Sequence, residues 1–220
     1  MKKSDLVIPF KFEDRKSIII NRFLYVPSHY NSHDKFRDEI TFENENEINI
    51  EYCSGNGEWI IDKAKKNPNI NFIAVEMKFL RARQIWVKMH KDNLKNLFVV
   101  KAEAFIFTKY YLKDLTSSDV FINFPDPWPK KKHAKNRLIK KEFLEEVSRI
   151  QKKDKTITIV TDHENYRDEI IEEFFKIKEY KTLFKKPYFV QNALDFGSSF
   201  FMDLFQSKDK SINFIKFARI

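Results

Sequence analysis

The chain contains little cysteine and little glycine, and its apolar runs are short. Cys53 is the single cysteine among 220 residues, which excludes an intramolecular disulfide framework. No apolar stretch approaches the roughly 20 residues that span a membrane, and the first residues lack the apolar run of a signal peptide. One cysteine and scattered histidines indicate no metal site. Together these absences predict a soluble, cytoplasmic protein with no membrane partner.

Glycine occurs three times, at Gly55, Gly57 and Gly197. Glycine this scarce is expected where the backbone needs a conformation or a close approach that a side chain would prevent. No Gly/Ser-rich linker divides the sequence, so we predict a single domain over residues 1–220. Residues 1–45 have a mixed pattern and form an N-terminal extension to which the sequence assigns no structure.

Acidic residues are outnumbered, with 32 Asp and Glu against 41 Lys and Arg and a net charge of +9. Such an excess can serve solubility alone, so its distribution matters. Residues 130–141 contain seven basic residues and no acid. A dense basic run is typical of phosphate binding and favours a nucleic-acid partner.

Short apolar runs alternate with longer amphipathic stretches, which is the pattern of an α/β domain with a mostly parallel sheet. Strands are expected at residues 48–53, 71–76, 97–101, 118–124 and 156–161, with two more in the tail at 200–204 and 212–217. Helices are expected at residues 58–66, 80–91, 104–115, 139–152 and 164–178.

Two glycines follow the first expected strand, in Cys53-Ser54-Gly55-Asn56-Gly57. Such a strand-to-helix loop lets the backbone approach a ligand closely. The second strand ends at Glu76, where a carboxylate can accept both hydrogen bonds of a ribose diol. Glu103 follows the third strand, where it could contact adenine or be an ordinary acid at a helix start. The third glycine of dinucleotide-binding loops is missing, which favours S-adenosylmethionine over NAD.

Three of the seven prolines lie in one segment that includes Phe124-Pro125-Asp126-Pro127-Trp128-Pro129. Proline fixes its own φ and biases the preceding residue toward extended conformations. We therefore expect Phe124, Asp126 and Trp128 to be held in defined directions at the end of a strand. Such rigidity suits a ligand site, although a proline-rich turn can also simply end a strand.

This proline turn, followed by Lys130, His133 and further basic residues, resembles the tRNA (guanine-N7-)-methyltransferase family, and the resemblance extends over residues 51–217. It implies the class I methyltransferase fold, a Rossmann-like, mostly parallel seven-stranded sheet with helices on both faces. It also implies S-adenosylmethionine as the methyl donor, S-adenosylhomocysteine as the product, and a guanine at position 46 in the variable loop of tRNA as the substrate.

The resemblance also assigns roles to individual residues. The implied cofactor-binding residues are Glu51, Cys53, Gly55, Gly57, Glu76, Glu103 and Asp126. The implied substrate-binding residues are Lys130, Asp162 and Ser199. The chain departs from the family at Cys53, where the family has its first loop glycine, and at Met202, which replaces an acid that Asp203 could supply.

The basic run predicts phosphate contacts by Lys131, Lys132, Lys135 and Arg137, and the resemblance implies that these phosphates are those of tRNA. Methyl transfer to guanine N7 needs no base, because N7 carries a lone pair in the ring plane. Asp126 is accordingly the expected catalytic residue, orienting guanine and favouring its cationic product. Trp128 either stacks on a base or packs under the turn, and His133 is expected to be a polar loop residue or phosphate contact.

Two other functions fit parts of this pattern. The proline turn loosely resembles the Asn/Asp-Pro-Pro-aromatic loop of amino methyltransferases that act on adenine. Cys53 and Met202 also allow an RNA-binding protein with a decayed cofactor pocket. The sequence leaves open whether the protein is a monomer or a homodimer.

Overall fold

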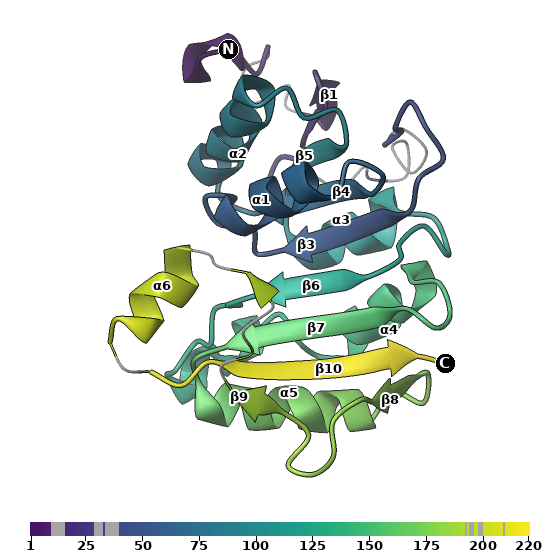
Figure 1. Cartoon of the computed structure of the whole chain (residues 1–220), viewed down its shortest axis with the longest axis vertical. Helices are drawn as coiled ribbons and strands as arrows, with labels where there is room; N and C mark the ends of the chain where they lie inside the picture. Colours follow the sequence, from purple (N-terminus) through teal and green to yellow (C-terminus); the bar gives the residue numbers. More distant parts are fainter. Residues whose placement is uncertain are drawn as a thin grey trace. The chain divides into compact units, whose positions relative to one another are not determined.

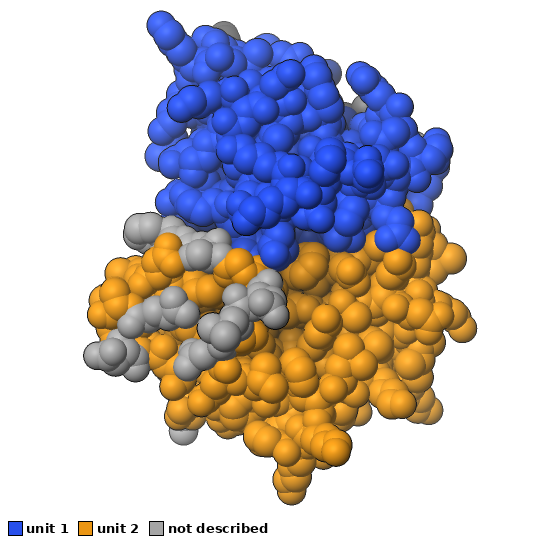
Figure 2. Space-filling model, viewed as in Figure 1, with its two compact units in different colours: residues 1–113 blue, residues 114–220 orange. Residues whose placement is uncertain are grey.

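A computed structural model describes residues 1–9, 16–28, 33, 40–191, 193, 196–197, 200–208 and 210–220. The chain divides into two compact units, residues 1–113 and residues 114–220, which Figure 2 shows in two colours. Each unit combines strands with helices in an α/β arrangement.

Unit 1 contains a mainly parallel set of strands in the order β1-β2-β5-β4-β3. The short strands β1 and β2 pair antiparallel, and β2, β5, β4 and β3 pair parallel with one another. The strands are Ile18–Ile20 (β1), Phe23–Tyr25 (β2), Ile48–Tyr52 (β3), Asn71–Glu76 (β4) and Leu97–Lys101 (β5). All residues of β4 and β5 are buried, as is typical of parallel strands covered on both faces.

The helices of unit 1 follow the strands as the pattern predicts. They are the α-helices Glu58–Lys66 (α1), Phe79–Lys91 (α2) and Ala104–Tyr111 (α3), whereas the 3-10 helix Lys3–Asp5 (η1) precedes the strands and was not predicted. Helix α1 packs on β4, and α2 packs on β4 and β5. Because β2 pairs with β5, part of the segment 1–45 belongs to the sheet of unit 1.

Unit 2 contains the strands Val120–Asn123 (β6), Thr156–Thr161 (β7), Tyr180–Thr182 (β8), Val190–Gln191 (β9) and Asn213–Arg219 (β10). Strands β6 and β7 are parallel, whereas β10 is antiparallel to β7, β8 and β9. In Figure 1, β7 and β10 run side by side, and helix α5 packs on both. The helices are the 3-10 helix Lys131–Asn136 (η3) and Lys141–Ile150 (α4), Glu164–Phe175 (α5) and Phe200–Gln206 (α6).

The tail contains the one strand prediction that was wrong. Residues 200–204 lie in helix α6, because Met202 is buried against Val160, Ile212 and Phe214 on one helical face. The short strands β1, β2, β8 and β9 were not predicted. The other predicted strands and helices are present, with ends that differ by at most four residues.

Candidate cofactor and substrate sites

The loop between β3 and α1 has a left-handed backbone at three positions. The φ angles are +62° at Cys53, +55° at Gly55 and +83° at Gly57. A Cβ atom on Gly57 would lie 2.7 Å from Cγ1 of Ile85 in α2, so a side chain there would clash as well as strain the backbone. The structure thus explains why one of three glycines occupies this position.

Cys53 has the φ angle of a glycine without being one. A left-handed conformation costs an ordinary residue about 1–2 kcal/mol. The loop backbone at Cys53 therefore has a conformation that favours glycine, and holding a cysteine in it costs stability.

Glu76 ends β4 and lies against this loop. Its carboxylate accepts hydrogen bonds from the backbone N–H of Gly55, at 2.9 Å, and of Lys78, at 2.7 Å. Only 6% of Glu76 is exposed, and this burial raises the pKa of its carboxyl group, against the lowering effect of the two backbone donors. Each carboxylate oxygen has two lone pairs, so Glu76 retains capacity to accept hydroxyl groups.

Two further acids of unit 1 were predicted to bind the cofactor. Glu51 lies on β3 and is 2% exposed. Glu103 is the N-cap residue of α3, but its side chain makes no capping hydrogen bond and is exposed. Of the three acids, Glu76 is the buried carboxylate at a strand end beside the left-handed glycine loop, and this arrangement fits an adenosyl ligand, whose ribose hydroxyls need acceptors.

The proline turn of unit 2 has a strained backbone. Phe124 and Trp128 have φ angles of +50° and +42°, in contrast to the extended conformations expected of residues that precede proline. A bulky residue in this left-handed region of backbone conformation reduces stability by about 1–3 kcal/mol and occurs where surrounding contacts enforce it. The N–H of Phe124 donates to the Val160 carbonyl at 2.9 Å, and the N–H of Trp128 donates to Oδ1 of Asp126 at 3.0 Å.

Asp126 itself is exposed at the surface of unit 2. Trp128 is half-buried and stacks on the imidazole ring of His133, with 5.7 Å between ring centroids and 11° between ring planes. The turn therefore presents one carboxylate to solvent beside an aromatic pair.

The basic segment contains side chains of two kinds. Lys130, Lys132 and Lys135 are exposed, as phosphate contacts require, whereas the side chain of Lys131 lies outside the described residues. Arg137, also predicted to contact phosphate, is instead turned toward the protein: 8% of its side chain is exposed, and it pairs with Glu169 of α5.

The remaining predicted substrate residues belong to β7 and the tail. Asp162 follows β7 and forms an ion pair with Lys210. Ser199 lies outside the described residues. Met202 is a core residue of unit 2, and the neighbouring Asp203 is exposed on α6.

Within the part of the chain that the structure describes, no three His, Cys, Asp or Glu side chains are grouped so as to hold a metal ion. Among the same residues, no helix has both the length and the apolar character needed to cross a bilayer.

Comparisons with known proteins define the class and then the family. The fold is that of the class I S-adenosylmethionine-dependent methyltransferases. For example, the 30S ribosomal A1408 methyltransferase from an uncultured bacterium aligns with a TM-score of 0.55 at 16% identity, over 79% of this chain and 88% of that one. A family model described as "Putative methyltransferase" matches residues 45–202.

Relatives along the whole chain are more specific. A tRNA (guanine-N(7)-)-methyltransferase of Chlamydia abortus is 39% identical over 100% of this chain and 98% of its own length. The Chlamydia caviae protein of the same name is 38% identical over the same shares. The chain belongs to the tRNA (guanine-N7-)-methyltransferase family, as its motifs predict.

Proposed function

We propose that this protein transfers the methyl group of S-adenosylmethionine to N7 of guanine 46 in the variable loop of tRNA. The observation that carries this proposal is the strained turn Phe124–Trp128, which presents an exposed carboxylate shortly before the exposed Lys130 and Lys132. The full-length relatives named for guanine N7 methylation of tRNA support the choice of substrate over the adenine alternative. The Glu76 contact with the glycine loop argues against a decayed pocket.

The proposed cofactor residues bind and orient the donor. Glu76 accepts the ribose hydroxyls, with its geometry fixed by the Gly55 and Lys78 amides. Cys53, Gly55 and Gly57 bring the backbone close to the ligand, and Glu51 and Glu103 contribute further acceptors. When bound, S-adenosylmethionine supplies an electrophilic methyl group on a sulfonium ion.

Asp126 is the proposed catalytic residue. Guanine N7 already has an available lone pair, so no proton need be removed before transfer. Asp126 accepts hydrogen bonds from the N1–H and amino edge of guanine and favours the positive charge that develops on the ring. Holding N7 in line with the methyl carbon supplies the rest, since orientation of this kind contributes up to roughly 7–11 kcal/mol.

The tRNA backbone is held by exposed lysines, which position the substrate without reading its sequence. We assign this role to the exposed Lys132 and Lys135 and to the neighbouring Lys131, with Lys130 next to the target nucleotide. Asp162 is paired with Lys210, and its carboxylate keeps lone pairs with which it can accept a hydrogen bond from the substrate. Ser199 remains the proposed contact from the tail, and Asp203 is the candidate for the role of the missing tail acid. We place the enzyme in the cytoplasm, as a monomer or homodimer.

Replacing Asp126 with Asn tests the catalytic assignment, because the amide keeps the shape and loses the charge. We expect the single-turnover rate to fall about a hundredfold or more, which corresponds to about 2.7 kcal/mol. Affinity for tRNA should change less than about tenfold, because the phosphate contacts persist. Near-normal methylation by a folded Asp126→Asn protein would remove Asp126 from the catalytic machinery.

A further inference from the structure

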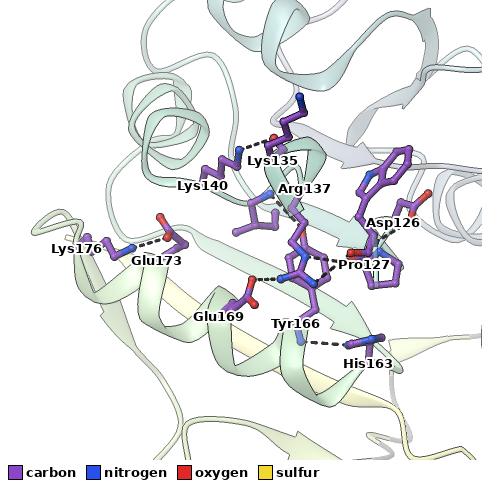
Figure 3. A network of polar contacts seen from close by, with 12 residues as sticks. Asp126, Pro127, Lys135, Arg137, Lys140, His163, Tyr166, Glu169, Glu173 and Lys176 are labelled. Atoms are coloured by element: carbon purple, nitrogen blue, oxygen red, sulfur yellow. Dashed lines mark hydrogen bonds and ion pairs between the residues drawn. The ribbon is translucent and has the colours of Figure 1, made fainter. Parts of the chain in front are cut away.

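Arg137 makes an unusual set of contacts for a residue in a basic run. Its Nε donates to the carbonyl oxygen of Pro127 at 2.7 Å, and one terminal nitrogen reaches the carbonyl of Trp128 at 3.4 Å. The other terminal nitrogen pairs with Glu169 of α5, and the guanidinium lies over the ring of Tyr166, 5.1 Å from its centroid. Figure 3 shows Arg137 between the proline turn and helix α5.

The carbonyl groups that Arg137 contacts belong to the strained part of the turn. Trp128 has a φ angle of +42°, and its N–H donates to Oδ1 of Asp126. Arg137 thus fixes the carbonyl of the same residue whose amide orients the Asp126 carboxylate. Within the part of the chain that the structure describes, Arg137 is the residue that hydrogen-bonds to the carbonyls of Pro127 and Trp128.

Helix α5 provides a firm anchor for the other side of Arg137. Its N-cap residue His163 accepts a hydrogen bond from the Tyr166 N–H at 3.2 Å. The Tyr166 hydroxyl accepts a hydrogen bond from the Ile139 N–H at 3.2 Å, so the chain just after Arg137 is tied to the same helix. The planar guanidinium, with donors in several directions, suits a residue that must join two segments.

These contacts distinguish Arg137 from the lysines beside it. Its side chain is 8% exposed, whereas Lys132 and Lys135 are exposed residues. The Pro127 and Trp128 carbonyls and the Glu169 carboxylate occupy three of the five N–H donors of the guanidinium, and its low exposure leaves little surface for a phosphate.

We propose that Arg137 is a positioning residue, which holds the Asp126 turn in its strained conformation against helix α5 and does not contact tRNA phosphate. The proposal rests on the proposed catalytic role of Asp126. It assigns Glu169 and Tyr166 a supporting role that their sequence positions, 32 and 29 residues after Arg137, did not reveal.

The test compares Arg137→Lys, which keeps the charge and loses the forked geometry, with Lys135→Gln, which loses one exposed charge. For Arg137→Lys we expect the single-turnover rate at saturating tRNA and S-adenosylmethionine to fall at least tenfold. The salt dependence of tRNA affinity should stay as in the wild type, and cofactor affinity should change less than twofold. For Lys135→Gln the slope of log affinity against log salt should flatten by about 0.7–0.9.

A spectroscopic signal reports on the turn independently of activity. With fluorotryptophan incorporated, the resonance of Trp128, assigned through Trp128→Phe, should shift or broaden in Arg137→Lys and stay unchanged in Lys135→Gln. If Arg137→Lys fails to fold, Glu169→Ala removes the anchor from α5 and should lower the rate at least threefold with the same change at Trp128.

Three results separate the possible failures. A normal rate and an unmoved Trp128 resonance in Arg137→Lys, or in Glu169→Ala where it is the variant used, would overturn the positioning role. The variant Arg137→Gln can form hydrogen bonds but has no charge. If its slope of log tRNA affinity against log salt is flattened, Arg137 is a phosphate contact and the proposal is overturned. If Asp126→Asn methylates normally, the catalytic proposal for Asp126 fails, while the Trp128 resonance still decides whether Arg137 holds the turn.

Discussion

Glu76 offers a quantitative test of the cofactor site, because one buried carboxylate is proposed to serve both the loop and the ligand. It accepts hydrogen bonds from the amides of Gly55 and Lys78 and has lone pairs left for ribose hydroxyls. A hydrogen bond to a charged group contributes about 1.5–3 kcal/mol. Glu76→Ala should therefore weaken S-adenosylmethionine binding by that amount, or about 10- to 150-fold.

Glu76→Gln separates the charge from the shape. One carboxylate oxygen becomes an NH2 group, which cannot accept from either backbone amide, so one loop contact is lost together with the charge. We expect affinity to fall, by less than in Glu76→Ala, while the fold is retained. Isothermal titration calorimetry gives the affinities, and circular dichroism verifies that each variant is folded.

The pH dependence of the two variants sharpens this test. Burial raises the pKa of Glu76 above its ordinary value of 4.5. Protonated Glu76 therefore stabilises the folded state relative to its ionised form. This stabilisation is fully present below pH 4.5 and is lost as the pH rises through the raised pKa. Cofactor affinity should run the opposite way and fall as the pH is lowered, because the ionised form is the better acceptor for hydroxyl groups.

In Glu76→Gln, the contribution of residue 76 to the pH dependence of stability and to the pH dependence of cofactor affinity should be lost. The reasoning would be refuted if wild type and Glu76→Gln bound S-adenosylmethionine equally well and with the same pH profile between about pH 8 and pH 5. That result would leave Glu76 as a structural clasp for the glycine loop.

Two other predictions concern the loop and the basic segment. Cys53→Gly relieves the strain of a left-handed residue at φ +62°, and the greater freedom of glycine in the unfolded chain partly offsets this gain. In urea titrations the free energy of unfolding should therefore rise by up to about 1 kcal/mol. A loss of stability would show that the cysteine side chain packs favourably. Replacing Lys131, Lys132 and Lys135 with Ala should flatten the salt dependence of tRNA affinity by about 0.7–0.9 per contact without changing cofactor binding. An unaltered slope would mean that these lysines serve solubility.

The sequence predicted the features that depend on local pattern. The bounds of α1 and β4 match their apolar runs and periodicity, and Glu76 ends its strand as predicted, where the structure adds its hydrogen bond from Gly55. The scarcity of glycine suggested that no side chain fits at Gly57. The structure gives the reason, which is a left-handed φ angle and the nearness of Ile85. In these cases the neighbouring residues and the type of element already determine where an element ends and which residue can occupy a position.

The features that sequence did not predict depend on distant partners. Strands of two or three residues, such as β8 and β9, exist because β10 pairs with them. The apolar run at residues 200–204 was too short to distinguish a strand from a helix, and the packing of Met202 decides for the helix. Arg137 was read as one more charge in a basic run, since its contacts with Glu169 and Tyr166 leave no local pattern.

Mass mapping of tRNA shows directly whether the protein methylates guanine 46. Bulk tRNA that lacks the modification is incubated with the protein and S-adenosylmethionine, digested, and mapped by mass spectrometry. We expect one added methyl group on guanine 46, recovered as cationic, alkali-labile 7-methylguanosine and dependent on S-adenosylmethionine. A methyl group on adenine or at another position, or tRNA that binds without being methylated, would contradict it.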